Sequence, residues 1–356
     1  MGEFRGKIVI LQFEMATIRE HIELAPYTSF GTNGKAKRLV EWHSVEELLQ
    51  YLHSQEGKEH LSERWTILGE GCNTLFTDDF DGTIIRSAAK GIQILEQSEE
   101  YITIRAMAGE VWDDVVAWST ERGLWGMENL SAIPSSVSAS AVQNIGAYGT
   151  EAKDVIEWVE YIDLANLSEC RILGSECKFG YRESIFKGAL AGKVIITAVV
   201  YRLRTTATPR LDYGTLRPEV EKAGDFSPEG IRRAVITIRN SKLPDPKKIG
   251  NAGSFFKNPI LPREQVERLK SEYPSMPIYE VAGAPDRLKI ATGWMIDTLG
   301  WKGKSMGKAG VHTHQALVLV NLGGATGKEV VALAERICEE VNEKFGVEIY
   351  PEVNIL

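Results

Sequence analysis

Residues 250–259 read GNAGSFFKNP and place small, apolar and polar side chains next to one another. The glycines and the alanine let a backbone approach a neighbouring group closely, and the two phenylalanines provide an apolar wall. Ser254 among them is either a turn residue or a hydroxyl that points at a ligand. Lysines on both sides form a local basic cluster that suits a diphosphate or, alternatively, belongs to a solvated loop: Lys242, Lys247, Lys248 and Lys257.

Two charged residues far apart in the sequence could also recognise a ligand. Arg182 lies in KFGYRESIFKG (178–188), and its planar guanidinium matches a carboxylate, although a surface ion pair with Glu183 is the commoner arrangement. Glu352 lies in YPEVNI (350–355), on an otherwise apolar C-terminal strand. Because acidic side chains are rarely buried unless they are paired, Glu352 either has a partner or faces water.

Two glycine-containing segments could bind a phosphorylated cofactor. GEGCN (69–73) follows a short apolar strand and could direct backbone N–H groups at a phosphate, with a plain turn as the alternative. It lacks the G-x-G-x-x-G pattern, so a Rossmann site is not supported. Residues 133–149, IPSSVSASAVQNIGAYG, predict a loop that wraps a planar or phosphorylated cofactor or, alternatively, a flexible surface loop.

Metal and nucleophilic chemistry receive less support. His312 and His314 would share one face of a strand, but no Asp, Glu or Cys nearby completes a ligand set, so we expect no metal and expect Gln315 to contact a ligand. The sequence contains neither G-x-S-x-G nor H-E-x-x-H, which disfavours a serine esterase and a zinc protease. Its four cysteines include no C-x-x-C pair and predict free thiols in a reducing cytoplasm, with two disulfides in a secreted protein as the alternative.

Length and composition define the class of protein. A chain of 356 residues exceeds what one hydrophobic core usually holds, so two or three domains are expected. Hydrophobic residues at 43% and charged residues at 25% are ordinary for a globular protein, and a net charge of −8 disfavours broad nucleic-acid or membrane-surface binding. No apolar run approaches the roughly 20 residues of a membrane span. Because Met15 opens a more natural start, residues 1–14 are interpreted as an upstream extension.

The elements that must position these residues mix helices and strands. A capping box at Ser44 and Glu47 predicts a helix over VEELLQYL, and residues 228–244 and 326–345 predict two more, the last ended by Gly346. Alternating or β-branched stretches predict strands at 65–68, 83–86, 101–109, 193–204 and 347–355. The fold class is therefore α+β or α/β.

Taken in order, the motifs resemble one family. GEGCN, IP…QNIGAYG, FGYRES, LDYGTL, KLPDPK, NAGSFFKNP and a terminal PEV follow the order found in UDP-N-acetylenolpyruvoylglucosamine reductases, the MurB family. The resemblance extends from about Ser29 to Val353, and FGYR with NAGSFFKNP and PEV is highly specific. LDYGTL is similar to the longer of the family's two subtypes, in which a tyrosine loop covers the substrate.

The resemblance implies an α+β fold and a cytoplasmic FAD enzyme. NADPH would reduce the flavin, whose N5 would pass a hydride to the enolpyruvyl methylene carbon, converting UDP-N-acetylglucosamine enolpyruvate to UDP-N-acetylmuramate for peptidoglycan synthesis. A monomer is expected, with neither nucleic acid nor membrane as partner. The implied parts are an N-terminal extension (1–18), two FAD-binding subdomains of the vanillyl-alcohol-oxidase (PCMH-like) type (19–88 with strand 347–356, then 89–228) and a substrate-binding domain (229–346).

The resemblance also assigns roles to single residues. Arg182 would hold the substrate carboxylate as negative charge grows, Ser254 would donate a proton to the second carbon, and Glu352, protonated or closely paired, would stabilise the same intermediate. Substrate contacts are expected from Tyr181, Tyr213, Lys242, Asn258 and Gln315. FAD contacts are expected from both glycine-containing segments: Gly69, Glu70, Gly71, Cys72, Asn73, Ile133, Pro134, Ser135, Ser136, Ser140, Asn144, Gly146 and Ala147.

Three positions depart from the family pattern. Ser135 and Ser138 replace glycine in the usual IPG-x-V-G, so a positive φ at either position would strain the loop. Cys72 replaces the serine of GEGSN, and a thiol is a weaker hydrogen-bond donor. Two other functions stay open: an oxidase or dehydrogenase of the same flavin-binding superfamily, and a flavin- or nucleotide-sugar-binding protein without catalysis.

Overall fold

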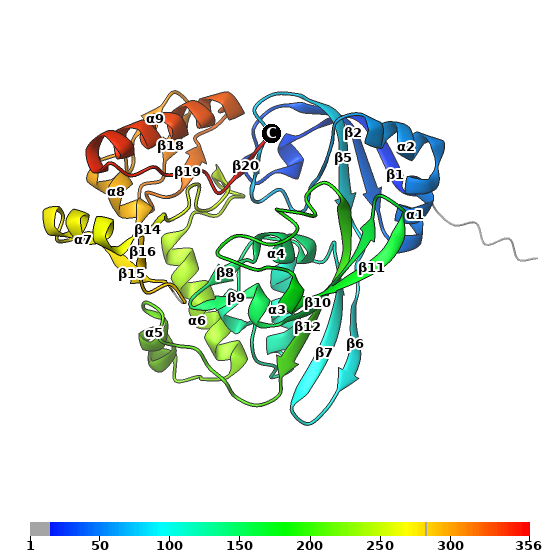
Figure 1. The fold of residues 1–356 in the computed structure, drawn as a ribbon, viewed down its shortest axis with the longest axis horizontal. Coiled ribbons are helices and arrows are strands. Elements are labelled where there is room, and N and C mark those ends of the chain that lie inside the picture. The colour runs from blue at the N-terminus through cyan, green and yellow to red at the C-terminus, as the bar shows by residue number, and fades with distance from the viewer. Residues whose placement is uncertain (1–14, 282) are drawn as a thin grey trace, which may run out of the picture.

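The computed structural model describes residues 15–281 and 283–356, so the expected extension over residues 1–14 lies outside the described residues. Helices and sheets form three lobes around a central region, and the chain is α+β as expected (Figure 1). None of the helices in the described part of the chain combines the length and the apolar composition needed to cross a lipid bilayer.

The N-terminal lobe is a four-stranded sheet covered by two helices, drawn in blue in Figure 1. Its strand order is β1-β2-β5-β3, in which β2 and β3 run parallel to β5 and β1 runs antiparallel to β2. Helix α1 begins after Ser44, whose Oγ accepts the N–H of Glu47 at 3.1 Å, so the predicted N-cap is confirmed. The bounds are β1 Thr17–Glu23, β2 Lys35–Trp42, α1 Val45–His53, α2 Gln55–Ser62, β3 Trp65–Ile67 and β5 Phe80–Ser87.

The second lobe is a five-stranded antiparallel sheet with the order β11-β10-β12-β7-β6. Its central strand is the long β-branched stretch predicted at 193–204, whose residues are nearly all buried. The apolar cluster of the first lobe also contains Ile162 and Ile195 of this sheet, so the two lobes share a core. The bounds are β6 Ile92–Gln97, β7 Tyr101–Met107, α3 Trp112–Thr120, β10 Ile156–Asp163, β11 Ser168–Leu173 and β12 Val194–Arg204.

Helices α5 (Leu216–Ala223) and α6 (Pro228–Lys242) pack on the second lobe. The apolar face of α6 is buried with α5 and with Trp125 and Leu211, and Arg232 of α6 makes a bidentate ion pair with Asp113 of α3. The substrate domain was predicted to begin at residue 229. The buried residues of α6 pack with α5, Trp125 and Leu211, and the boundary itself stays a prediction.

The C-terminal lobe contains two small sheets and the longest helix, α9 (Gly327–Phe345). Thr326 and Glu329 cap α9 reciprocally, and Gly346 ends it in the left-handed region at φ 62°, as predicted. The sheets have the orders β13-β19-β18-β17 and β14-β16-β15. Their bounds, with the two shorter helices, are β13 Gly250–Asn251, β14 Ile260–Pro262, α7 Arg263–Glu272, β15 Ile278–Glu280, β16 Arg287–Ile290, α8 Thr292–Thr298, β17 Ser305–Met306, β18 Ala309–Val311 and β19 Leu319–Asn321.

After α9 the chain returns to the first lobe. The C-terminal strand β20 covers only Asn354–Ile355 and pairs in parallel with β4 (Thr74–Leu75), so the strand predicted over 347–355 is mostly wrong. Pro351 forms a single antiparallel bridge with Phe256. The segment then changes partner: the N–H of Glu352 donates to the carbonyl of Phe255, and the N–H of Asn354 donates to the carbonyl of Asn73.

Candidate active site

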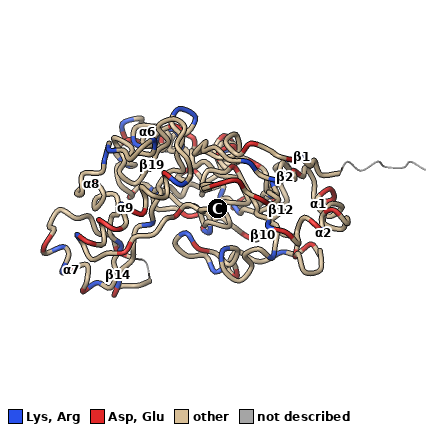
Figure 2. The backbone as a smooth tube through the Cα atoms, turned by 90° about the horizontal axis from the view of Figure 1, so that it is seen from above, with Lys and Arg blue, Asp and Glu red and all other residues tan. Residues whose placement is uncertain are grey.

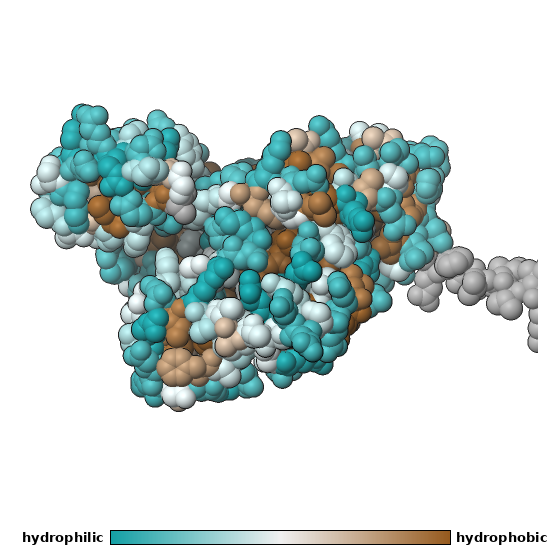
Figure 3. Space-filling view, turned by 60° about the horizontal axis from the view of Figure 1, so that its bottom comes forward, coloured by the Kyte–Doolittle hydropathy of each residue, from teal (hydrophilic) through white to brown (hydrophobic). Residues whose placement is uncertain are grey.

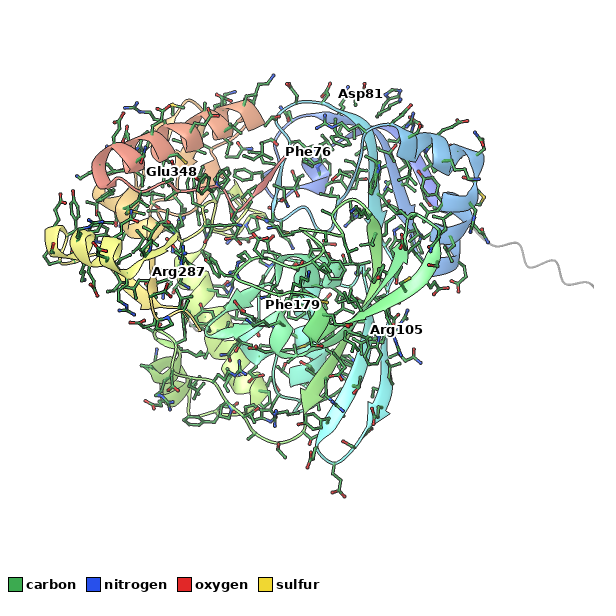
Figure 4. All side chains as sticks on the ribbon, in the orientation of Figure 1. Phe76, Asp81, Arg105, Phe179, Arg287 and Glu348 are labelled. Carbon is green, nitrogen blue, oxygen red and sulfur yellow. The ribbon has the colours of Figure 1, made fainter. Side chains whose placement is uncertain are left out.

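A cavity of about 1440 Å³ lies where the three lobes meet. Figure 3 shows the surface hollowed beside the C-terminal lobe, and Figure 4 shows the side chains of the three lobes in the orientation of Figure 1. The walls of the cavity come from the first lobe, the second lobe, the loop around Tyr213, the segment 252–258 and the C-terminal segment.

Residues 69–73 form one wall of the cavity. Gly71 has φ +63°, and a Cβ there would collide with the carbonyl oxygen of Tyr27. A Cβ at Gly69 would lie 2.6 Å from the Oγ of Ser136. Gly69 therefore allows the two predicted cofactor segments to pack directly against each other, and Gly71 allows its turn to pack against residues 27–28.

Residues 133–149 are not the continuous loop that the composition predicted. They contain helix α4 (Val137–Gln143), whose N-cap Ser136 accepts the N–H of Ala139 at 3.3 Å, followed by the two-residue strand β8 (Gly146–Ala147). The alternating small residues hide this short helix, whose buried residues include Val137 and Ala141. Strand β9 (Thr150–Glu151) pairs with β8.

The serines that replace glycine cause no backbone strain. Positive φ angles in this segment fall at Asn144, Tyr148 and Gly149, not at Ser135 or Ser138. The expected cost of these substitutions therefore does not arise. At the third departure, burial raises the pKa of the Cys72 thiol to about 12, so the thiol stays protonated at neutral pH.

Most predicted cofactor residues line the cavity, and two do not. Ser140 and Asn144 are buried beneath its wall, where the Oγ of Ser140 lies 2.9 Å from the hydroxyl of Tyr201 and the Nδ2 of Asn144 donates to the carbonyl of Gly180 at 2.9 Å. Their side chains support α4 and the segment beside it. The residues that do line the cavity are Gly69, Glu70, Gly71, Cys72, Asn73, Ile133, Pro134, Ser135, Ser136, Gly146 and Ala147.

The walls fit a ligand with several hydrogen-bonding groups. Trp42 and Ser87 line the cavity, and the Nε1 of Trp42 and the Oγ of Ser87 are buried without a partner among the described residues. Buried polar atoms are normally hydrogen-bonded, so a bound molecule would supply the missing partners. Together with the glycine turn at 69–71, these groups are compatible with FAD.

Arg182 and Glu352 meet at this cavity although 170 residues separate them. The Nε of Arg182 donates to the Oε1 of Glu352 at 2.9 Å, and its Nη2 donates to the carbonyl of Gly146, also at 2.9 Å. Arg182 has φ +59°, an unfavourable angle for a residue with a Cβ. Glu352 thus has the partner that its position required.

Ser254 lies beside this pair. The N–H of Glu352 donates to the carbonyl of Phe255 at 2.7 Å, and the N–H of Lys257 donates to the carbonyl of Tyr350 at 3.0 Å. These bonds align the segment after Ser254 with the C-terminal segment. The hydroxyl of Ser254 is exposed in the cavity and has no hydrogen bond from the described residues, which favours a role toward a ligand over a role in the turn.

The glycines of GNAGSFFKNP have separate structural reasons. Gly253 has φ +68° with open space at its Cβ position, so the turn before Ser254 requires it. Gly250 approaches the first lobe so closely that a Cβ would meet the carbonyl of Phe30. One glycine therefore directs the serine into the cavity, and the other docks the segment on the first lobe.

Of the predicted substrate contacts, three line the cavity and two do not. Tyr181, Tyr213 and Asn258 belong to its walls. Lys242 is exposed at the end of α6, and Gln315 lies in the turn after β18, where its Oε1 accepts the N–H of Leu317 at 3.5 Å.

His312 and His314 lie in the same turn and not on a strand. The ring Nδ1 of His312 accepts the backbone N–H of His314 at 3.4 Å. Within the described residues no three His, Cys, Asp or Glu side chains are grouped to hold a metal ion.

Four cations that line the cavity were missed by sequence reasoning: Lys153, Arg210, Arg239 and Lys289. Burial lowers the pKa of Arg239 and of Lys289, and the Nζ of Lys289 lies 4.8 Å from the ring centre of Tyr181. Two of the four cations lie beside motifs: Arg239 directly precedes the lysine-rich segment 240–259, and Arg210 directly precedes LDYGTL (211–216). Charges of both signs are interspersed along the backbone in Figure 2. Lys153 and Arg210 form ion pairs with Glu151 and Asp154 of the same cavity, so Arg239 and Lys289 are the cations of this set that favour an anionic ligand.

Comparisons with known proteins agree with this geometry. Residues 37–166 match the family model for an FAD binding domain, and residues 245–356 match that for the C-terminal domain of UDP-N-acetylenolpyruvoylglucosamine reductase. A reductase of that name from Bacteroides fragilis (strain YCH46) is 45% identical over 339 residues, which cover 95% of this chain and 100% of the relative. One from Pseudomonas aeruginosa is 43% identical over 342 residues, 95% of this chain and 98% of the relative.

A solved structure supports the same fold. The enzyme MurB from Thermus caldophilus superposes with a TM-score of 0.66 at 23% identity and covers 96% of this chain and 99% of its own. The two-part FAD-binding module with its C-terminal α+β domain defines an FAD-dependent oxidoreductase. Within that class, the chain belongs to the MurB family of UDP-N-acetylenolpyruvoylglucosamine reductases.

Proposed function

We propose that this protein reduces UDP-N-acetylglucosamine enolpyruvate to UDP-N-acetylmuramate with electrons from NADPH, in the cytoplasm, as a step of peptidoglycan precursor synthesis. The observation that carries the proposal is the convergence of Arg182, Ser254 and Glu352 on one cavity from three distant segments. All four cysteines are free thiols, which supports a reducing compartment.

The cofactor is proposed to lie against the wall formed by residues 69–73 and 133–136, with Gly146 and Ala147. When bound, FAD supplies the transfer of a hydride from NADPH to the methylene carbon of the enolpyruvyl group. Backbone N–H groups at the Gly71 turn and the unpartnered Trp42 and Ser87 are the groups available to hold it.

Arg182 is proposed to stabilise the charge that develops on the substrate carboxylate after the hydride arrives. Its guanidinium is anchored on Glu352 and on the carbonyl of Gly146, so its direction is fixed before substrate binds. Preorganised donors of this kind cost little reorganisation during the reaction. The ion pair also answers how Glu352 can lie near a second carboxylate, because Arg182 offsets part of the repulsion.

Ser254 is proposed to protonate the second carbon of the enolpyruvyl group. A serine hydroxyl is small, neutral and protonated at pH 7, and this one is exposed in the cavity without an internal partner. The carbonyl of its neighbour Phe255 accepts a hydrogen bond from the backbone N–H of Glu352. The proposed proton donor is therefore held next to the proposed charge-stabilising pair by the backbone.

The UDP-sugar is proposed to contact Tyr181, Tyr213 and Asn258, with Tyr213 covering the diphosphate. Tyr213 is 51% exposed and packs edge-on against Tyr148 at 6.2 Å, a contact that a covering loop could break and remake. Lys242 and Gln315 remain proposed contacts, although neither lines the cavity in this structure.

An anaerobic titration tests the proposal. The purified protein should be yellow, NADPH should bleach the flavin absorbance, and the enolpyruvyl UDP-sugar should restore it with formation of UDP-N-acetylmuramate. Bleaching without recovery would indicate a flavin enzyme with a different substrate. A yellow protein that NADPH does not bleach would indicate a binding protein, and a colourless protein that takes up no FAD would contradict both.

A further inference from the structure

Gln143 is the last residue of α4, and its side-chain amide contacts the carboxylate of Glu352. The Nε2 of Gln143 donates to Oε1 at 2.9 Å. The Nε of Arg182 donates to the same oxygen, also at 2.9 Å. No group in residues 15–281 and 283–356 donates to Oε2, so the two known donors both engage one side of the carboxylate.

Both ends of this hydrogen bond are held in place. Gln143 is followed by Asn144, which ends α4 at φ 42° and donates from Nδ2 to the carbonyl of Gly180. The backbone of Glu352 is held by the Nδ2 of Asn73, which donates to its carbonyl at 3.2 Å. Because neither backbone needs to be ordered further, the Gln143–Glu352 bond fixes the rotation of the carboxylate at little entropic cost.

This arrangement distinguishes the two carboxylate oxygens chemically. Oε1 faces the hydrogens of two donors, so a proton on Glu352 would be carried by Oε2. Glu352 lines the cavity, and Oε2 is the oxygen left for a ligand there. An Oε2 that carries a proton can donate to an anionic oxygen of the substrate, whereas an unprotonated Oε2 would repel it.

We propose that Gln143 is a positioning residue for the reduction: it turns Glu352 so that Oε2 is presented to the enolpyruvyl carboxylate and Oε1 is kept for Arg182. The inference rests on the proposed function, since it concerns the step in which charge develops on that carboxylate. Gln143 acts through Glu352 and transfers no proton or electron itself.

Gln143→Met tests the proposal because methionine keeps the length of the side chain and removes the amide donor. Single-turnover reduction of the enolpyruvyl UDP-sugar by the pre-reduced enzyme should slow about tenfold, in line with a lost hydrogen bond to a charged group. Reduction of the flavin by NADPH should change less than about twofold. In a Glu352→Ala background the same substitution should cost less than about twofold more, because the carboxylate through which Gln143 acts is absent.

A matched control is available on the surface. The Nε2 of Gln55 donates to the Oε1 of Glu59 at 2.8 Å, far from the cavity, so Gln55→Met removes the same kind of contact and should leave both half-reactions unchanged. If Gln143→Met loses its flavin, Gln143→Glu serves as the second variant. It keeps the shape of the side chain, places an acceptor against Oε1, and should slow the sugar step at least as much.

A crystal structure of Gln143→Met provides a readout independent of turnover. The carboxylate of Glu352 should be rotated or adopt two orientations. An unchanged carboxylate, an unslowed sugar step, or an equal slowing in the wild-type and Glu352→Ala backgrounds would overturn the proposal. A wild-type enzyme that NADPH reduces and the sugar does not reoxidise would overturn the proposed function, and this inference with it. A wild-type enzyme that the sugar does reoxidise, with an unslowed Gln143→Met variant, would overturn this inference alone.

Discussion

The proposed cofactor wall, residues 69–73 and 133–147, and the proposed catalytic rim, Arg182, Ser254 and Glu352, are built in different ways. The wall uses backbone, glycines and short hydroxyl side chains from two segments whose close approach depends on Gly69. The rim uses one cation, one hydroxyl and one carboxylate brought together by contacts across the whole chain. Damage to the wall should therefore act on cofactor binding, and damage to the rim on one chemical step.

The largest effect is expected for Ser254→Ala. Loss of a positioned proton donor costs about 10²–10⁴-fold, so reduction of the enolpyruvyl sugar should slow by that factor while flavin reduction by NADPH stays nearly intact. Stopped-flow absorbance of the two half-reactions measures both. Equal damage to both half-reactions would assign Ser254 to the wall and not to the rim.

Arg182→Ala should follow, with a slowing of about 10²–10³-fold in the sugar step, because a preorganised donor to the developing charge is lost. Glu352 would also lose its positively charged partner, so the affinity for the anionic sugar should fall as well. Single-turnover experiments at several sugar concentrations separate the two effects: the limiting rate reports the chemical step, and the concentration that gives half of that rate reports the affinity for the sugar. A variant whose only defect is flavin content would contradict the proposed role.

Gly71→Ala should affect the wall and leave the rim intact. A Cβ there meets the carbonyl of Tyr27, so the 69–73 turn must move and the purified protein should carry less flavin per chain. The ratio of visible to ultraviolet absorbance reports the flavin content. Gly224→Ala is the control: Gly224 has φ +69° with open space around it, so that variant should lose about 1–2 kcal/mol of stability and keep its flavin.

The smallest effect is expected for Thr326→Ala, which lies outside both regions. The Oγ1 of Thr326 accepts the N–H of Glu329 at 3.2 Å at the start of α9. Removing this N-cap should reduce the free energy of unfolding by about 1 kcal/mol, measured by denaturant titration, with flavin content and both half-reactions unchanged. A change in either half-reaction would show that α9 communicates with the cavity.

Local signals in the sequence were sufficient for several elements. Ser44 with Glu47, the β-branched stretch 194–204 and Gly346 each acted through neighbours in the chain, and their helices and strand were confirmed. The short α4 was missed because seven residues rich in Ser and Ala carry little periodicity. The C-terminal strand was overestimated because the segment changes partner: Pro351 makes a single bridge with Phe256, and only Asn354–Ile355 pair with β4.

The site residues also divide into those that sequence motifs indicated and those that only the fold reveals. Motif resemblance selected Arg182, Ser254 and Glu352, which the fold brings to one cavity, yet no spacing in the sequence connects them. Lys153, Arg210 and Lys289 enter the cavity from separate elements, and only the assembled fold shows that they face it. Ser140 and Asn144 lie in the right segment, but their burial turns them from ligand contacts into supports.

A crystal structure with FAD and the enolpyruvyl UDP-sugar tests the convergence of the rim most directly. The account predicts the guanidinium of Arg182 within hydrogen-bonding distance of the substrate carboxylate, Glu352 beside it, and the hydroxyl of Ser254 in contact with the carbon that receives the proton. A substrate whose enolpyruvyl group lies elsewhere, with water between it and all three side chains, would contradict it.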